Sequence, residues 1–393
     1  MNKRGFKLTA TLIICSLTLL LSGCWDRVEV NDLGLVLAVG LDKAENGEIE
    51  VAIQLAIPSR MGGGQGGGQI EGDPTTVEKM TGRSVFDALS KLQASISRRI
   101  FWGHNRVIFI GEELAKEGIQ KHLDYFSRDP DPRIRANVFV SEGKATDILN
   151  VVPDFDKSSA EVARELANFQ VGMNVTLKDL LEMLTSDVNT AALPLIEVDK
   201  AEHGKGGLRV NGTAIFKRDK MVGKIGPELT RGLLWIRDEI RLAAVLVEPE
   251  DTEGGQVVFN LLRSHTELIP KIDKNGNLKM TLKVTTEDDV VENETKLNLL
   301  NAKLVNKLQK QLENRIKERI QDTLEEVQKN LKVDVFGFGQ AFYRAYPKQW
   351  AILKENWDEV FPEVEVDIDV KAYIKRTGVS TTPQGVPEKE VQK

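Results

Sequence analysis

The longest amphipathic pattern in the sequence lies late in the chain, between about residues 294 and 331. Its ten apolar positions span 34 residues, a mean spacing of 3.8, whereas a left-handed coiled coil repeats every 3.5 residues and a straight stripe every 3.6. The stripe therefore turns by about 160° around the helix. We expect one long helix whose ends contact different partners, packed across a sheet or bridging two domains, rather than a coiled-coil dimer. The ten positions are Leu297, Leu300, Leu304, Leu308, Leu312, Ile316, Ile320, Leu324, Val327 and Leu331.

Shorter apolar patterns predict two regions that differ in the order of their elements. In the first, strands near 48–57 and 107–110 alternate with helices such as 112–126, which favours a layered arrangement. From 144 to 200 the pattern is mostly helical. After residue 207, a hairpin over 213–225 and two further strand patterns precede the long helix. The predicted fold class is therefore α+β, that is mixed α/β, with several domains in which helices pack on mixed β-sheets.

Composition changes place the domain boundaries. A polar, glycine-rich stretch at 202–207 separates the two regions, and six glycines between 61 and 69 predict a mobile loop. Gly62, Gly64 and Gly67 in that loop match G-x-G-x-x-G, but no helix follows them, so we reject a dinucleotide site. The predicted domains are a signal peptide at 1–23, an N-terminal α/β region at 24–200 that can divide into two subdomains, a C-terminal α+β domain at 201–376, and a disordered tail at 377–393.

The first residues have the pattern of an export signal. Lys3, Arg4 and Lys7 precede the uncharged stretch Leu8 to Leu21. Its 14 residues suit the apolar core of a signal peptide. A membrane-spanning helix would need about 20 apolar residues. The chain is therefore expected to be exported.

The signal ends in Leu21-Ser22-Gly23-Cys24, which resembles the lipobox of bacterial lipoproteins. In that class the cysteine thiol is alkylated by a diacylglycerol, with acyl chains such as palmitate, and the peptidase then cuts before the cysteine, whose amino group can also be acylated. Cys24 is thus the predicted lipidation site, and two acyl chains give a stable membrane anchor. The weaker alternative is a plain cleaved signal with an incidental cysteine. Either way, the trimmed chain keeps one cysteine at its N-terminus, which excludes an intramolecular disulfide, a Cys-based zinc site and a buried catalytic thiol.

Charge and motifs argue against nucleic-acid binding and catalysis. Removal of residues 1–23 leaves 50 basic and 59 acidic residues, a formal charge of −9, which disfavours non-specific binding to nucleic acid or anionic lipid. The four histidines, His104, His122, His203 and His265, lie far apart, and no catalytic, cofactor or metal motif accompanies them. His104 has the most unusual setting, among arginines and aromatic residues. We favour a hydrogen-bonded structural histidine at the entrance of a strand over a pH-sensitive group at a partner surface. Trp102 and Trp350 are expected in the core.

Four carboxylates alternate with apolar residues near the C-terminus. Glu363, Glu365, Asp367 and Asp369 would lie in one row on a strand. We favour a solvated sheet face over a patch for a basic partner or a weak cation, because carboxylates two apart on a strand do not converge as they do in a calcium loop.

Several longer segments resemble the C-subunit lipoproteins of spore germinant receptors, the Ger(x)C family. The segments are Cys24-Trp-Asp-Arg-Val-Glu-Val-Asn-Asp-Leu33 with Val36-Leu-Ala-Val-Gly-Leu-Asp42, then Trp102-Gly-His-Asn-Arg-Val-Ile-Phe-Ile-Gly111, Asp129-Pro-Asp-Pro-Arg133, Gly212-Thr-Ala-Ile-Phe-Lys217 and Thr230-Arg-Gly-Leu-Leu-Trp235. The resemblance covers nearly the whole chain and departs from the family pattern in the six-glycine loop. It implies a mixed α/β protein of three domains, without enzymatic activity, anchored on the outer face of the inner membrane of dormant spores. There it would assemble with a polytopic A subunit and a transporter-like B subunit that together respond to nutrients.

The leading functional prediction is therefore a non-enzymatic, lipid-anchored receptor subunit without cofactor, metal or direct small-molecule ligand. The runner-up is a solute-binding lipoprotein of a membrane transporter, which would need a deep cleft between two similar α/β lobes. An envelope hydrolase is a third possibility, and the absence of motifs and of an acid–base pair counts against it.

Overall fold

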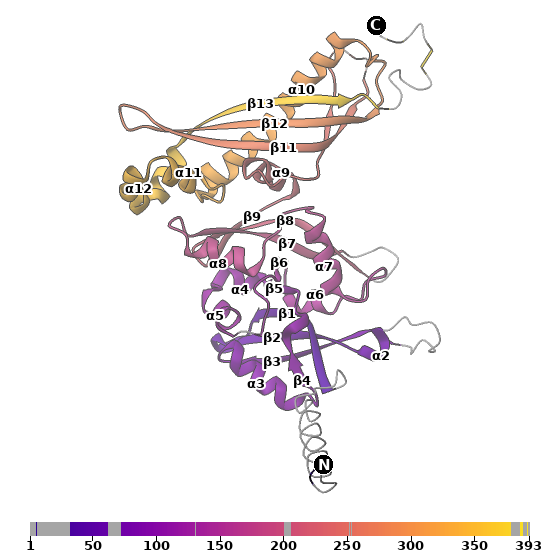
Figure 1. Cartoon of the computed structure of the whole chain (residues 1–393), viewed down its shortest axis with the longest axis vertical. Helices are drawn as coiled ribbons and strands as arrows, with labels where there is room; N and C mark the ends of the chain where they lie inside the picture. The colour runs from indigo at the N-terminus through magenta and orange to yellow at the C-terminus, as the bar shows by residue number, and fades with distance from the viewer. Residues whose placement is uncertain are drawn as a thin grey trace.

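The computed structural model describes residues 32–61, 72–129, 131–199, 206–250 and 254–378, together with positions 5, 252, 386, 387 and 391. The predicted lipidation site Cys24 lies outside the described residues, as do nearly all residues of the predicted signal peptide, the glycine-rich loop and the predicted tail. Two β-sheets follow one another along the long axis of the molecule (Figure 1).

The first sheet has nine strands and a parallel centre. Its order is β3-β2-β1-β5-β6-β7-β8-β9, and β4 pairs with the start of β1. The pairs β1–β5, β5–β6 and β6–β7 are parallel, and the flanking pairs are antiparallel. Parallel strands covered on both faces are continuously apolar, and all five residues of β5 are buried. The strands are β1 Leu33–Lys43, β2 Ile49–Ala56, β3 Thr75–Gly82, β4 Arg99–Phe101, β5 Val107–Gly111, β6 Asn137–Ser141, β7 Thr190–Asp199, β8 Gly207–Lys217 and β9 Lys220–Ile225.

Helices cover both faces of this sheet (Figure 1). α3, α4, α5 and α8 lie on one face, and α6 and α7 on the other, where alanines of α7 allow close packing against β5 and β8. The predicted single helix over 112–126 is wrong, because Gly118, at φ 134°, separates α4 from α5. The helices are α2 Pro58–Met61, α3 Val85–Ser95, α4 Glu112–Glu117, α5 Gln120–Arg128, α6 Ala145–Leu149, α7 Ser159–Asn168 and α8 Leu177–Thr185, with 3-10 turns η2 Glu45–Gly47 and η3 Trp102–His104.

The mostly helical pattern predicted for 144–200 holds only as far as α8. The last ten residues form β7, whose first seven residues are buried. A strand buried on both faces has no two-residue alternation, so periodicity alone does not separate it from a buried helix.

The second sheet contains a long antiparallel hairpin. Its order is β10-β11-β12-β13, with β13 parallel to β12, so the chain crosses over between these two strands. Both hairpin strands are 16 residues long, well beyond the two apolar patterns in the sequence. The elements are β10 Ala244–Val247, β11 Val257–Ile272, β12 Leu278–Asn293 and β13 Glu365–Arg376, and around them α9 Pro227–Ile236, α10 Ala302–Leu324, η4 Glu325–Leu331, α11 Phe338–Ala345, α12 Pro347–Leu353, η5 Lys354–Asn356, α13 Trp357–Val360 and η6 Phe361–Glu363.

The long late helix is confirmed as α10 and its π-helical continuation η4, which ends at Leu331 as predicted. It begins at Ala302 rather than near 294, because asparagine side chains cap turns before it; Leu300 N–H donates to Asn298 and Lys303 N–H to Asn301. Its two ends contact different partners, as the turning stripe predicted. Near the N-terminal end Gln309 accepts from Ile374 of β13, and near the C-terminal end Thr323 donates to Leu229 O of α9.

Helix α9 and the segment after η4 join the two sheets. Thr190 Oγ1 of β7 donates to Asp334 O at 2.6 Å, and Trp350 Nε1 donates to Asp187 Oδ2 at 2.9 Å. Arg237, just after α9, donates to Val335 O. The predicted α+β class with mixed sheets is confirmed, and Trp102 and Trp350 are both in the core. The boundary predicted between residues 200 and 201 lies between two paired strands, β7 and β8, and the domain division stays a prediction.

A buried carboxylate in the second sheet makes stability depend on pH. Asp288 of β12 is fully buried; Thr286 Oγ1 donates to its Oδ2, and its Oδ1 has no partner among the described residues. Burial, with a smaller effect of Asp289, raises the pKa of Asp288 from 3.8 to about 6. Because the folded pKa is the higher one, folding favours the protonated form. The cost of the buried charge is therefore absent below about pH 4 and complete above about pH 6.

We expect Asp288→Asn to stabilise the fold by about 2 kcal/mol at pH 7.5, and this gain should disappear at pH 4. Urea unfolding of both proteins at the two pH values measures it. Asp369→Asn, on the exposed side of β13, is the matched control and should change little at either pH. A gain of equal size at both pH values would contradict the assignment.

Candidate functional site

Two segments far apart in sequence meet at one edge of the first sheet. Residues 102–106 lead into β5 and residues 129–136 lead into β6. Because β5 and β6 are adjacent and parallel, the segments before them lie at the same edge. Two backbone hydrogen bonds fix the arrangement: Arg106 N–H donates to Leu37 O at 3.0 Å, and Asn137 N–H donates to Arg106 O at 2.8 Å.

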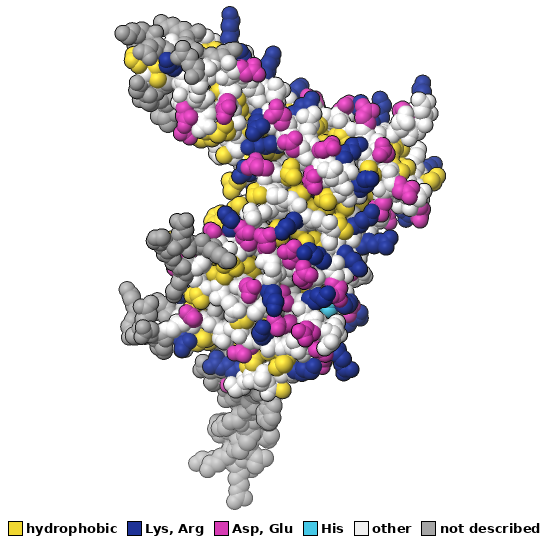
Figure 2. Space-filling view, turned by 180° about the vertical axis from the view of Figure 1, so that it is seen from behind, with side chains coloured by type: hydrophobic (Ala, Val, Ile, Leu, Met, Phe, Trp, Pro, Cys, Tyr) yellow, Lys and Arg dark blue, Asp and Glu magenta, His cyan; other side chains and the backbone are white. Residues whose placement is uncertain are grey.

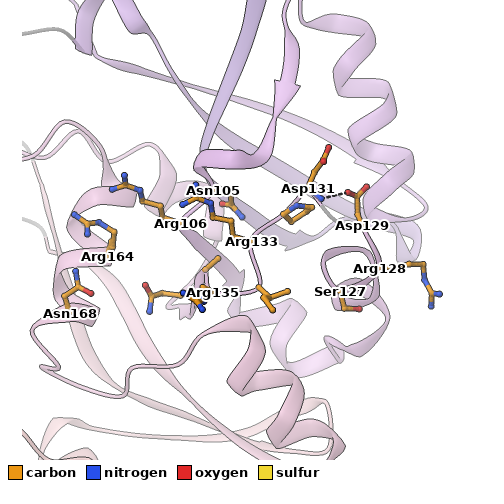
Figure 3. A pocket seen from close by; sticks show the side chains of 14 residues that line it. Asn105, Arg106, Ser127, Arg128, Asp129, Asp131, Arg133, Arg135, Arg164 and Asn168 are labelled. Atoms are coloured by element: carbon orange, nitrogen blue, oxygen red, sulfur yellow. Dashed lines mark hydrogen bonds between the residues drawn. The ribbon is translucent and has the colours of Figure 1, made fainter. Parts of the chain in front are cut away.

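These segments, with the end of α5 and residues of α7, line an open pocket of about 960 Å³ (Figure 3). We call it the edge pocket. Such a volume is in the range of small-molecule sites. The lining residues are Asn105, Arg106, Ser127, Arg128, Asp129, Asp131, Pro132, Arg133, Ile134, Arg135, Ala136, Asn137, Arg164 and Asn168.

Aromatic packing next to the edge pocket fixes the turn before β5. Trp102 is buried and packs edge-on against Tyr125 and Phe126 of α5, with ring centroids 6.2 Å apart in each pair. Asn105 N–H donates to Trp102 O at 2.8 Å, which closes the turn before β5. Burial, together with the nearby charges of Asp129 and Asp131, raises the pKa of Tyr125, so its phenol stays protonated.

The five arginines of the edge pocket differ in their partners. Three form ion pairs: Arg106 with Glu161 at 3.1 Å, Arg164 with Glu161 and Glu165, and Arg128 with Asp124 at 2.7 Å. Arg128 points away from the other labelled arginines (Figure 3). Within the described part of the chain, the side chains of Arg133 and Arg135 have no hydrogen-bond or ion-pair partner. The pocket therefore offers two unneutralised guanidinium groups.

Asn105 is the other unusual residue of the edge pocket. Its side chain is fully buried, and neither the amide nitrogen nor the amide oxygen has a partner among the described residues. A buried amide without partners costs free energy, because it gives up its hydrogen bonds to water. The sequence pattern indicates His104, one residue earlier, as the unusual residue and predicts no role for Asn105 or for the arginines of the second segment.

The structure places the histidines apart. His104 is exposed and makes no hydrogen bond to a described residue, so the interpretation as a hydrogen-bonded structural histidine is wrong; Trp102 and Asn105 hold the strand entrance. Burial lowers the pKa of His122 to about 4 and keeps this ring neutral. His265 Nδ1 lies 3.0 Å from Asp238 Oδ2, and His203 lies outside the described residues. Within the described ranges, no group of three His, Cys, Asp or Glu is arranged to hold a metal ion.

The carboxylate row of β13 is a solvent-exposed face, as favoured from the sequence. Glu363, Glu365, Asp367 and Asp369 are all exposed, but Glu363 lies in η6, so only the last three form a row on β13. Lys279 of β12 pairs with Glu365 at 3.0 Å and with Asp367 at 2.5 Å, and these two hydrogen bonds raise the pKa of the lysine. Pairs this exposed contribute little to stability.

Two of the segments that resemble the family, 212–217 and 230–235, make close contacts inside the fold. Gly212 has φ 137°, and a Cβ there would lie 2.1 Å from Ile225 O. Gly232 lies where α9 crosses α10. Thr213, which follows Gly212, and Thr230, two residues before Gly232, share a buried hydrogen bond of 2.9 Å. We therefore assign these two segments a structural role, whereas the segments that begin at Trp102 and Asp129 contribute to the edge pocket.

Known proteins resemble the chain over almost its full length. Residues 26–198 match the family described as "Spore germination protein N-terminal domain", and residues 211–378 match "Spore germination B3/ GerAC like, C-terminal". The "Putative spore germination protein YfkR" of Bacillus subtilis (strain 168) is 31% identical over 384 residues, which cover 96% of this chain and 98% of the relative. "Spore germination protein KC" of the same organism is 29% identical over 398 residues, covering 96% and 97%.

A solved structure shares the fold. The "Crystal Structure of the GerBC protein" superposes with a TM-score of 0.54 at 18% identity and covers 86% of this chain and 96% of that one. At this identity the likeness concerns the fold alone. The matches to both family models and the full-length relatives show that the chain belongs to the Ger(x)C family of spore germination proteins.

Proposed function

We propose that the protein is the lipid-anchored C subunit of a nutrient germinant receptor and acts in spore germination without catalysing a reaction. The observation that carries this proposal is the similarity to spore germination proteins over 96% of the chain, through both sheets. Its partners would be the polytopic A subunit and the transporter-like B subunit, at the outer face of the spore inner membrane.

The anchor would be a diacylglycerol on Cys24. Seven residues separate Cys24 from Asp32, the first residue of the continuously described fold. At about 3.5 Å per residue, this linker reaches at most about 28 Å, so the body would stay close to the lipid surface. Confinement near a membrane raises the effective concentration of the subunit for membrane partners without any new contact. None of the described helices is both long and apolar enough to cross a bilayer.

The solute-binding alternative requires two similar α/β lobes around a cleft. The two sheets instead have nine and four strands, with a parallel centre in the first and a long hairpin in the second. No observation favours a solute-binding lipoprotein, although co-purification with a permease and an ATPase would.

We expect Cys24→Ala to release the protein from the spore membrane fraction and to impair nutrient germination, because the thiol is the site of alkylation. Cys15→Ala, within the uncharged run, removes a thiol from the same segment but leaves Cys24 intact, and it should behave as wild type. The measurements are membrane fractionation of dormant spores and the fall in optical density after nutrient is added.

Affinity purification from solubilised spore membranes tests the partners. Co-purification of two polytopic subunits with the wild type, lost or weakened in Cys24→Ala, would support the proposal. Recovery with a permease and an ATPase would favour a transporter lipoprotein instead. Normal germination in the Cys24→Ala strain would contradict the proposed role of the anchor.

A further inference from the structure

The residues that line the edge pocket include more basic than acidic side chains, although the whole chain has a formal charge of −6. Five of its fourteen lining residues are arginines and two are aspartates, and no lysine or glutamate lines it. On the face shown in Figure 2, by contrast, acidic and basic side chains are interspersed. The planar guanidinium group presents paired donors that fit two oxygens of a phosphate or carboxylate, which a lysine ammonium cannot do.

Arg133 and Arg135 are the two arginines available to a ligand. Both are exposed, and neither side chain has a partner among the described residues, whereas the side chains of the other three arginines are already paired.

The backbone that carries these two arginines is held in place. Ala136 N–H donates to Arg133 O at 3.0 Å, and Lys178 N–H of α8 donates to Ile134 O at 2.9 Å. A fixed backbone lowers the entropy lost when the arginines bind a ligand.

Asn105 supplies an independent sign of a missing partner. This amide forms part of the wall of the pocket, is fully buried, and has two N–H donors and one oxygen acceptor unused. A ligand oxygen that reaches the wall would give the amide nitrogen an acceptor. Buried polar groups without a partner are rare in native folds, and an absent ligand is one explanation for them.

We propose that the edge pocket binds a phosphate group, with Arg133 and Arg135 as its ion-pair partners and the Asn105 amide as a neutral donor. A phosphate has enough oxygens to engage two guanidinium groups and an amide together. The group can come from a phosphorylated small molecule or from a lipid headgroup. Both sources have access, because the pocket lies at the edge of the sheet where β1 begins: Leu37, five residues after Asp32, accepts from Arg106 of the pocket.

The test uses the full chain purified in a neutral detergent, with binding followed by titration calorimetry. The probes are glycerol phosphate for a free phosphate monoester, dihexanoyl-phosphatidylglycerol for an anionic headgroup, and dihexanoyl-phosphatidylcholine as the zwitterionic lipid control. The variant is the double substitution Arg133→Gln with Arg135→Gln, and the matched control is Arg344→Gln, an exposed arginine of α11 without a partner among the described residues.

We expect saturable binding of one of the two anionic probes, at least tenfold weaker in the double variant and unchanged in Arg344→Gln. Tighter binding of glycerol phosphate identifies a free phosphorylated ligand, and tighter binding of the phosphatidylglycerol identifies a headgroup. No saturable binding of either anionic probe, or equal affinity in the double variant and wild type, would overturn the proposal. Saturable binding of the phosphatidylcholine as tight as that of the phosphatidylglycerol would also overturn it.

Asn105→Leu separates binding from folding. Replacing an unpartnered buried amide by an apolar side chain of similar size should leave the melting temperature unchanged or raise it. The same variant should bind the phosphate probe several-fold more weakly. Unchanged probe affinity in Asn105→Leu would remove the amide from the proposed site.

Discussion

The Asp334→Ala variant is expected to melt about 10 °C below the wild type, the largest loss that we predict for a single side chain. Asp334 lies between η4 and α11 and is 4% exposed. Its Oδ1 accepts from the backbone N–H groups of residues 336, 337 and 338, at 3.1–3.2 Å. Its Oδ2 accepts from Gly339 N–H at 2.7 Å and Trp357 Nε1 at 2.9 Å.

Removal of this carboxylate leaves five donors without their acceptor in a buried loop. Each unmet buried donor costs about 1–3 kcal/mol, and entry of water into the vacated space offsets part of the sum. We therefore expect a loss of about 4 kcal/mol, at the upper end for one substitution. The loop also joins the two sheets, because Thr190 of β7 donates to Asp334 O. In Asp334→Ala the two sheets should therefore separate more readily.

Asp358→Ala is the matched control for this measurement. Asp358 follows Trp357 directly and pairs with Lys217 at 3.0 Å, but both side chains are substantially exposed. We expect it to change the free energy of unfolding by less than about 1 kcal/mol. Thermal unfolding followed by tryptophan fluorescence would measure both variants. A melting temperature of Asp334→Ala equal to that of Asp358→Ala would show that the carboxylate is not the centre of the loop.

Gly232→Ala is the second large expected effect, with a loss of about 2 kcal/mol or more. A Cβ at Gly232 would lie 2.0 Å from Thr323 Oγ1 and 2.6 Å from Arg319 O, both on α10. Because one of these atoms belongs to the backbone, rotation of a side chain cannot relieve the contact and the helices must move apart. The higher helix propensity of alanine, about 1 kcal/mol, offsets part of the cost.

Two further variants test the cause. Arg231→Ala changes the neighbouring residue of α9, whose side chain forms an ion pair with Glu228 at 2.9 Å, and it should have a small effect. Thr323→Ala combined with Gly232→Ala removes the nearest clashing atom but leaves Arg319 O, so it should restore part of the stability. Urea unfolding measures all three proteins. A Gly232→Ala protein as stable as Arg231→Ala would mean that α9 and α10 pack more loosely than the structure indicates.

The late helix was predictable because its information is local. Ten apolar residues at near-helical spacing specify both the helix and its turning stripe, so its end at Leu331 and its two partners follow from the sequence. Its start was not predicted, because Leu297 and Leu300 continue the spacing while side chains of Asn298 and Asn301 bind the backbone instead. Capping by single polar atoms is invisible to periodicity.

The edge pocket was not predicted, because it depends on which strands are neighbours. Asn105 and Arg133 are 28 positions apart in the sequence, and no spacing rule connects them. They meet because β5 and β6 are adjacent and parallel, which sequence order alone does not establish. The sequence did contain one signal of the pocket: two family-like segments, beginning at Trp102 and Asp129, each precede a predicted strand. If these strands are adjacent and parallel, the segments before them lie at the same edge of the sheet.

The position of β1 has a mechanical consequence. β1 carries the chain from the N-terminal side into the fold, and it lies inside the nine-stranded sheet, between β2 and β5, rather than at its margin. A force that pulls on the segment before Asp32 therefore acts along a strand with hydrogen bonds on both sides. Extraction must shear these bonds together instead of opening them one after another, because they lie across the direction of pull. The first sheet is thus built to bear tension at the point where a tether would enter it.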